Sequence, residues 1–299
     1  MTIYDLCLAW NWPYDADFVA LLEAACRERG LSVLQVTPET LETALQQMAS
    51  GELAFRATLN RASDTDPRFL PLIQLAQARG VFRLNPRERE ERAADKATMH
   101  LEFITAGLNT PYTIILSPFA EQPGLPPLDL SPLGASFAIK PAHGGGGAGV
   151  ICEATSLDQV YAARQQHPTD KYLLQAHVTP TVLQGRPAWF RVIYCSGQVY
   201  PCWWDTHTRV YTPVTDVEET ELGLTPLREM TLAIGRVNRL HLFSTEIART
   251  AAGQFLAVDY VNDQIDLRLQ SQAVDGVPDV IVRDIANRLA DVLLAVKLI

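Results

Sequence analysis

The chain has 299 residues, of which 47% are hydrophobic, and this content predicts two or three compact units with buried cores. Its formal net charge of −9, with no block of Lys and Arg, argues against a nucleic-acid partner. The five cysteines lack metal-type CxxC spacing, so we expect reduced thiols in a cytoplasmic protein. No apolar run could cross a bilayer, and Asp5 stands where a signal peptide would be basic, so no membrane contact is expected.

Strand-like and helix-like segments alternate over the first 85 residues. The expected strands are residues 3–10, 31–36, 53–59 and 81–84, and the expected helices are residues 15–29, 38–49 and 67–79. Gly30 and Gly80 end the first and the last of these helices. Such alternation predicts a small parallel sheet covered by helices.

The pattern changes after residue 85, where the alternation stops. The next expected elements are helices around residues 88–94 and 96–107 and strands at residues 112–116 and 137–140. Residues 118–132 are rich in proline and predict a long exposed loop. Lys140 closes the last of these strands, and a glycine-rich loop comes directly after it.

This loop, residues 141–150, is the most informative stretch of the sequence. It holds four consecutive glycines and one more, Gly144, Gly145, Gly146, Gly147 and Gly149. Glycines leave backbone N–H groups free to close around a phosphate, and they adopt backbone angles that other residues avoid. The amine of Lys140 beside them is a point charge suited to phosphate oxygens. The loop therefore predicts a nucleotide site, although a flexible surface hairpin would have the same pattern.

Two familiar nucleotide motifs are excluded by the residues after the glycines. Gly144, Gly146 and Gly149 match G-x-G-x-x-G, but that pattern needs a helix directly behind it. Residues 150–152 are instead strand-like, and the next helix begins only at the capping box formed by Ser156 and Gln159. The loop also lacks a Gly-Lys-Ser/Thr sequence, so the segment is neither a Rossmann turn nor a P-loop.

The order and spacing of the later segments resemble the ATP-grasp superfamily, in particular carboxylate–amine ligases of the ribosomal-protein-modifying glutamate ligase and glutathione synthetase type. The resemblance covers residues 85–299, with Lys96 entering a helix and Lys140 preceding the glycine hairpin. Further similar segments are the hinge strand at residues 172–178, the arginine-bearing hairpin at 191–199, and the metal-bearing strands at 245–247 and 257–262.

The resemblance implies an α/β fold that becomes α+β in its C-terminal part. Residues 1–85 would form the α/β domain that precedes the ATP-grasp fold. Residues 86–180 would form its smaller subdomain with the glycine-rich lid, and residues 181–299 the subdomain with the metal site.

The resemblance also implies ATP and Mg²⁺ as cofactors and assigns residues to them. Arg191 and Arg268 would be catalytic, Arg191 by stabilising the acyl phosphate and Arg268 by facing the γ-phosphate or a substrate carboxylate. Metal ligands would be Glu246, Asp259 and Asn262. The nucleotide-binding residues would be Lys96, Lys140, His143, Gly144, Gly145, Gly146, Gly147, Gly149, Gln175, His177 and Val178.

The sequence departs from the superfamily pattern at the second metal strand, which usually reads Glu-x-Asn. Asp259 and Asn262 are three residues apart and would face opposite sides of a regular strand. Either a bulge or the strand end brings Asn262 to Asp259, or Asp263 or Asp266 takes its place. The hinge also lacks the common acidic ribose ligand, so ribose recognition stays unassigned.

The function implied is an ATP-dependent ligase that joins a carboxylate to an amine through an acyl phosphate. Its partners would be small-molecule or peptide carboxylates and amines, and homo-oligomerisation is left open. Two alternatives remain, a small-molecule kinase of the same fold and a non-catalytic nucleotide-binding regulatory or scaffold protein. Plain structural roles also remain open: Arg191 as a salt-bridge partner of Glu246, and Arg268 as a surface partner of Asp263 or Asp266.

Overall fold

A computed structural model describes residues 1–298. The first sheet is formed by β1 (Thr2–Trp10), β2 (Val33–Val36), β3 (Leu53–Arg61) and β4 (Phe82–Leu84), in the order β2-β1-β3-β4 with every pair parallel. The helices between these strands are α1 (Ala16–Glu28), α2 (Leu41–Ala49) and α3 (Leu70–Ala78). The predicted parallel sheet covered by helices is confirmed. Two of the expected helices begin later than predicted, because short 3-10 turns at Pro13–Asp15 and Pro67–Phe69 precede α1 and α3.

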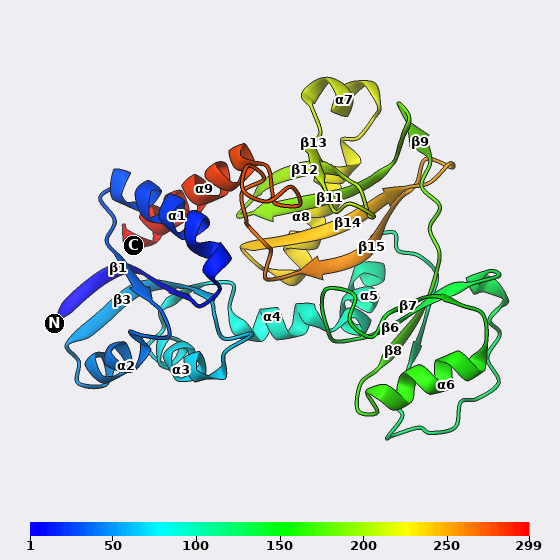
Figure 1. Cartoon of the computed structure of the whole chain (residues 1–299), viewed down its shortest axis with the longest axis horizontal. Coiled ribbons are helices and arrows are strands. Elements are labelled where there is room, and N and C mark those ends of the chain that lie inside the picture. The colour runs from blue at the N-terminus through cyan, green and yellow to red at the C-terminus, as the bar shows by residue number, and fades with distance from the viewer. Residues whose placement is uncertain (299) are drawn as a thin grey trace.

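The two faces of this sheet are buried against different helices (Figure 1). Leu6 and Leu8 of β1 join a core with α1, whereas Cys7 and Ala9 join a core with α2 and α3. Neighbouring residues of a strand point to opposite faces, so a continuous apolar run such as β1 serves both cores at once.

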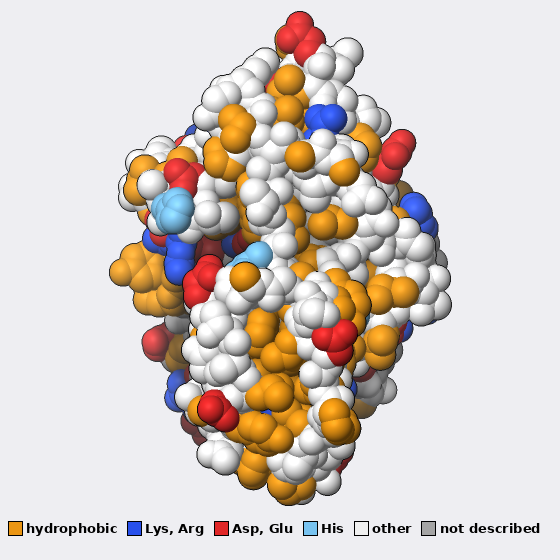
Figure 2. Space-filling view, turned by 90° about the vertical axis from the view of Figure 1, so that its right-hand side faces the viewer, with side chains coloured by type: hydrophobic (Ala, Val, Ile, Leu, Met, Phe, Trp, Pro, Cys, Tyr) orange, Lys and Arg blue, Asp and Glu red, His pale blue; other side chains and the backbone are white. Residues whose placement is uncertain are grey.

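A second sheet, which we call the lid sheet, contains β5 (Thr113–Leu116), β8 (Tyr172–Ala176), β6 (Phe137–Pro141) and β7 (Ile151–Ala154) in that spatial order, all antiparallel. Helix α6 (Leu157–Gln166) covers one face, and its Ser156–Gln159 capping box is present as predicted. The proline-rich stretch runs outside it with one 3-10 turn, Ser131–Leu133. Figure 2 shows apolar side chains gathered over this lower part of the molecule.

The third sheet, called the central sheet below, contains β13 (Tyr211–Pro213), β12 (Gln198–Trp204), β11 (Trp189–Cys195), β14 (Leu242–Arg249) and β15 (Phe255–Asn262) in spatial order, all antiparallel. Four more helices and a two-stranded antiparallel ribbon lie outside the three sheets. The helices are α4 (Arg87–Ala94), α5 (Lys96–Thr105), α7 (Asp216–Glu221) and α8 (Pro226–Asn238), and the ribbon pairs β9 (Val182–Leu183) with β10 (Arg186–Pro187). Trp203 and Trp204 are buried in the central sheet and add large apolar side chains to its core.

The last helix, α9 (Asp279–Lys297), returns to the first sheet and packs on α1 (Figure 1). Ile285 and Leu289 share a core with Leu6 and Leu8 of β1. The first sheet is formed by strands within residues 2–84, the lid sheet by strands within 113–176 and the central sheet by strands within 189–262. The chain beyond Pro278 packs against residues 1–85 as well as against β11. Within the described residues, no helix has the length and apolar character needed to span a membrane.

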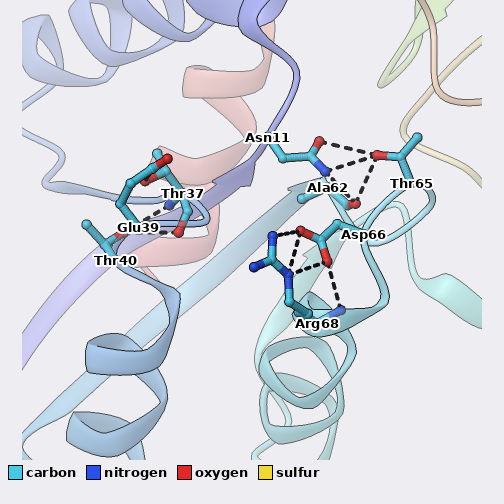
Figure 3. Close-up of polar contacts among 8 residues, drawn as sticks. All are labelled: Asn11, Thr37, Glu39, Thr40, Ala62, Thr65, Asp66 and Arg68. Atoms are coloured by element: carbon cyan, nitrogen blue, oxygen red, sulfur yellow. Dashed lines mark hydrogen bonds and ion pairs between the residues drawn. The ribbon is translucent and has the colours of Figure 1, made fainter.

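Loops at the carboxyl edge of the parallel sheet are joined by polar contacts (Figure 3). Asn11 Nδ2 donates to Thr65 Oγ1 at 3.0 Å and to Ala62 O at 3.3 Å, which ties the loop after β1 to the loop after β3. Asp66 and Arg68 form an ion pair on the exposed side of the second loop. Open α/β sheets bind their ligands at this edge. The contacts therefore hold in place the loops that border such a binding region.

A buried ion pair lies just beneath those loops. Arg61, the last residue of β3, donates to both carboxylate oxygens of Asp15 at 2.7 and 2.8 Å, and its Nη2 also donates to Ile265 O at 2.9 Å. Arg61 and Asp15 are 4% and 1% exposed. The pair therefore fixes the segment after β15 against the first sheet.

Asn85 makes a second connection across the same junction. It has a left-handed backbone with φ of 60°, and its amide nitrogen donates to Leu242 O at 2.6 Å and to Asp263 Oδ1 at 2.8 Å. Its amide oxygen accepts from His241 N at 2.7 Å. One side chain thereby holds the start of β14 and the residue directly after β15.

Replacing Arg61 with methionine should lower the free energy of unfolding by about 3–5 kcal/mol, because Asp15 would keep a buried charge without a partner. Urea denaturation monitored by circular dichroism measures this change in the free energy of unfolding. Arg68→Met is the matched control, since it breaks an exposed Asp–Arg pair and should leave stability unchanged within error. Similar losses in the two variants would contradict the role given to the buried pair.

Candidate nucleotide and metal site

Lys140 lies where the lid sheet meets the central sheet. Its Nζ donates to Gln175 Oε1 on β8 at 2.7 Å and to Val258 O on β15 at 3.4 Å. The lysine that precedes the glycine loop therefore contacts the residue next to Asp259, a predicted metal ligand. Figure 2 shows basic and acidic side chains together around a recess at mid-height of this face.

Lys96 is the first residue of α5, a helix that Asp95 caps. Its Nζ donates to Gly144 O at 2.5 Å, so the start of the helix is bound to the glycine loop. Burial lowers the pKa of Lys96; Asp259 opposes that shift and Lys140 adds to it. Both predicted phosphate lysines are thus close to one another and to a predicted metal ligand.

The glycine loop has a backbone that few other residues could adopt. The angle φ is positive at Gly144 (115°), Gly146 (63°), Gly147 (81°) and Gly149 (72°), but not at Gly145. His143 anchors the base of the loop, because its Nδ1 lies 2.8 Å from Asp170 Oδ1 and its backbone N–H donates to Asp170 Oδ2 at 2.9 Å. The four consecutive glycines are exposed, which leaves their N–H groups accessible to an anion.

The predicted hinge residues lie at the end of β8. Gln175 is buried and binds Lys140, as described above. His177 and Val178 come directly after the strand, and His177 Nε2 lies 3.6 Å from Glu153 Oε1 on β7. Of these three residues, the structure brings Gln175 alone into contact with a predicted phosphate ligand.

A bulge between β14 and β15 brings the predicted metal ligands onto one side. Glu246 is opposite Asp259, and Ser244 is opposite Asn262, so two steps on β14 match three on β15. The extra residue reverses the alternation, and Asn262 Nδ2 donates to Asp259 Oδ2 at 3.0 Å. Of the alternatives considered for Asn262, the structure adopts the bulge.

Glu246 is held by two donors from β11. Trp189 Nε1 donates to its Oε2 at 3.0 Å, and Arg191 Nη1 donates to its Oε1 at 3.2 Å. Burial raises the pKa of Glu246, and Asp259 raises it further while Arg191 opposes the change. The guanidinium of Arg191 also lies 5.0 Å from the ring centre of Trp204. This arginine is fixed beside the carboxylates by strand pairing and by stacking.

The donor set at Glu246, Asp259 and Asn262 fits magnesium in its chemistry. Carboxylate and amide oxygens are the ligands Mg²⁺ prefers, and two carboxylates facing each other repel until a cation is present. No three His, Cys, Asp or Glu side chains gather into a metal site anywhere in residues 1–298. Mg²⁺ often binds through one or two carboxylates and completes its shell with water and phosphate oxygens.

The other candidates near this strand are engaged elsewhere. Asp263 accepts from Asn85, and burial raises its pKa to about 7. Asp266 accepts from Arg268 Nε at 2.8 Å, and Asp275 accepts from Arg268 Nη2 at 2.9 Å. Arg268 thus pairs with Asp266, as the alternative structural role expected. It also pairs with Asp275, seven residues along the chain, which the sequence did not indicate.

Three residues in contact with the site were not anticipated from sequence. Trp189 lies two residues before Arg191, so strand alternation could have placed it on the same face. His100 lies four residues after Lys96 on α5, the spacing of neighbours on one helix face. Tyr260 lies next to Asp259 on β15, and no local signal marks its hydroxyl as part of the site.

Comparisons with known proteins identify the fold. No protein-family model matches the chain, and no characterised protein matches it by sequence. Solved structures match almost all of it. The ATP-grasp ligase PsnB, with a minimal precursor, Mg and ADP, has a TM-score of 0.64 at 13% identity, over 99% of both chains.

Two further structures agree. A RimK-domain ATP-grasp protein from Sphaerobacter thermophilus gives a TM-score of 0.64 at 19% identity, over 96% of this chain and 99% of that one. D-alanine–D-alanine ligase from Bacillus anthracis with ATP gives 0.64 at 11% identity, over 98% and 97%. At such identities the likeness shows the fold, so the chain has the ATP-grasp fold, and the resemblance inferred from sequence is confirmed at that level.

Glu246→Gln should change how stability depends on pH. Because the pKa of Glu246 is raised from its ordinary value of 4.5, the folded protein keeps a proton there that the unfolded chain has released. The free energy of unfolding that this group contributes is therefore highest below pH 4.5 and falls as pH rises. Urea unfolding in EDTA should favour the variant increasingly from pH 4.5 to neutral pH. An identical trend in the exposed control Glu28→Gln would contradict this.

Proposed function

We propose that the protein is an ATP-dependent enzyme that uses Mg²⁺ to ligate a carboxylate to an amine through an acyl phosphate. One observation carries the proposal. Two lysines, Lys96 of α5 and Lys140 of the lid sheet, lie close to two carboxylates of the central sheet, Glu246 and Asp259, with Arg191 alongside. Phosphoryl transfer asks a protein mainly for positioning and charge neutralisation, and this grouping supplies both.

Each part of the grouping has a proposed task. Lys96 and Lys140 would hold the α- and β-phosphates, and the glycine loop would fold over them and exclude water. Glu246, Asp259 and Asn262 would hold Mg²⁺, which when bound neutralises phosphate charge. Arg191, kept beside Glu246 by its strand and by Trp204, would stabilise negative charge on the acyl phosphate and on the tetrahedral intermediate formed when the amine attacks.

The acceptor would enter from the side that faces the first sheet. A cavity of about 450 Å³ opens there, lined by Pro13, Tyr14, Ala16, Asp17, Arg268, Gln272 and Ala273. Arg268 could serve as the substrate clamp if a substrate carboxylate displaced Asp266 or Asp275 from it. Another cavity, of about 360 Å³, is lined by residues of α4, α5 and α8. None of the proposed nucleotide or metal ligands lines it, so it plays no part in the proposal.

Known relatives of the fold support the cofactors and the substrate class. PsnB has been crystallised with a precursor peptide and AMPPNP, and with a minimal precursor, Mg and ADP, and D-alanine–D-alanine ligase has been crystallised with ATP. By analogy we propose ATP and Mg²⁺ for this chain, with a peptide or small-molecule substrate.

Lys140→Ala should weaken binding of MgATP about tenfold or more, on the order of 1.4 kcal/mol for one lost charged contact. Isothermal titration calorimetry measures the dissociation constant. Lys297→Ala is the control, because that lysine pairs with Asp5 beside the first sheet and should bind MgATP as the wild type does. Unchanged affinity in both Lys140→Ala and Lys96→Ala would rule out the proposed phosphate site.

Release of ADP and phosphate should require a carboxylate and an amine together, and the product should have their summed mass less one water. Pools of amino acids, peptides and small acids, analysed by mass spectrometry, would identify the pair. Arg191→Met should lower kcat about a hundredfold or more, the range for removing one group that stabilises an oxyanion. A phosphorylated hydroxyl product would instead establish the kinase, and ATP binding without turnover would favour the scaffold.

A further inference from the structure

A chain of buried hydrogen bonds runs from Lys140 into the core between the two sheets. Lys140 Nζ lies 2.7 Å from Gln175 Oε1, Gln175 Nε2 lies 3.0 Å from the Tyr260 hydroxyl, and that hydroxyl lies 2.6 Å from His100 Nδ1. Gln175, Tyr260 and His100 are 2%, 2% and 3% exposed. Four elements, β6, β8, β15 and α5, each contribute one member.

The lysine sets the direction of the first two hydrogen bonds of this chain. A lysine ammonium can only donate, so the amide oxygen of Gln175 must face it and the amide nitrogen must face Tyr260. The oxygen of Tyr260 then accepts, which leaves its proton free to be donated to Nδ1 of His100. That donation needs a neutral His100 with its proton on Nε2, and burial, which lowers the pKa of His100, favours the neutral form.

The position of the chain places it next to three charged groups of the candidate site, Lys96, Lys140 and Asp259. His100 lies one helical turn after Lys96 on α5, and Tyr260 is the residue after Asp259 on β15. The chain is thus a direct polar connection between the elements that carry both lysines and a metal-binding strand. Buried hydrogen-bond networks of this kind favour one geometry, because a rotated member leaves a buried polar group unpaired.

We infer that Tyr260 and His100 are positioning residues that fix Lys140 for nucleotide binding, an inference that rests on the proposed function. Lysine has four flexible side-chain bonds and loses much rotamer entropy when it is held in one place. Tyr260 prevents the amide of Gln175 from turning its nitrogen toward Lys140. His100 keeps the hydroxyl of Tyr260 oriented, and so acts on the lysine through Tyr260 and Gln175.

The experiment compares two phenylalanine variants. Tyr260→Phe removes the linking hydroxyl and should raise the dissociation constant of MgATP about three- to tenfold, the equivalent of one neutral hydrogen bond. Tyr172→Phe is the matched control. Its hydroxyl is equally buried on β8 but has no hydrogen-bond partner within the described residues, and its ring packs against the α6 core. That variant should bind MgATP within about twofold of wild type, since the hydroxyl it removes is not part of the chain from Lys140 to His100.

A double-mutant cycle separates positioning from a purely structural role. If Tyr260 acts through Lys140, Tyr260→Phe should have no further effect on affinity once Lys140→Ala is present. A structural role would instead give additive losses, and additivity would overturn the inference. His100→Leu should repeat the loss seen in Tyr260→Phe, and nitrogen NMR of the nucleotide-free protein should show the Nε2-protonated form of His100.

The outcomes also distinguish this inference from the proposed function. No binding of MgATP by the wild type would defeat both. Binding that Lys140→Ala weakens but Tyr260→Phe does not would defeat the positioning role alone and leave the nucleotide site standing. A His100 imidazole protonated on Nδ1 would likewise overturn the direction of the chain.

Discussion

The geometry of the candidate site depends on the buried pair of Arg61 and Asp15. Arg61 ends β3, Asp15 precedes α1, and the same guanidinium donates to the carbonyl of Ile265, three residues beyond Asn262. Buried ion pairs add little net stability compared with apolar residues, but breaking one is costly, so they favour one arrangement over others. Here the favoured arrangement seats the end of the second carboxylate strand on the first sheet.

The acids at this junction are partly buried. Burial raises the pKa of Glu90 on α4 to about 9, with Asp263 contributing, and raises that of Asp263 to about 7. Helix α9 closes the same region from the other side by sharing one core with α1 and β11. The first sheet and the central sheet therefore form a continuous body. The lid sheet is connected to it through α5, the glycine loop and the chain from Lys140 to His100.

Local signals in the sequence were sufficient to predict most helices and strands, but not to predict how these elements pair and pack with one another. The parallel sheet, the capping box at Ser156 and the hairpin nature of the glycine loop follow from periodicity and caps, which act within a few residues. The bulge that brings Asn262 to Asp259 depends on register with β14, which no local pattern encodes. The return of α9 to the first sheet is non-local for the same reason, since its amphipathic face suits any apolar surface.

The pKa values of a lysine and a carboxylate at the candidate site are shifted in opposite directions, and one kind of ligand would counteract both shifts. Burial lowers the pKa of Lys96 and raises that of Glu246, so each group is held where its own charged form is disfavoured. Arg191 relieves Glu246 only in part, because the carboxylate of Asp259 faces it across the strands. A polyanion would favour the charged lysine, and a divalent cation would favour the charged carboxylates. A magnesium nucleotide brings both at once, so its binding would stabilise both sides of a site that neither ion alone would satisfy.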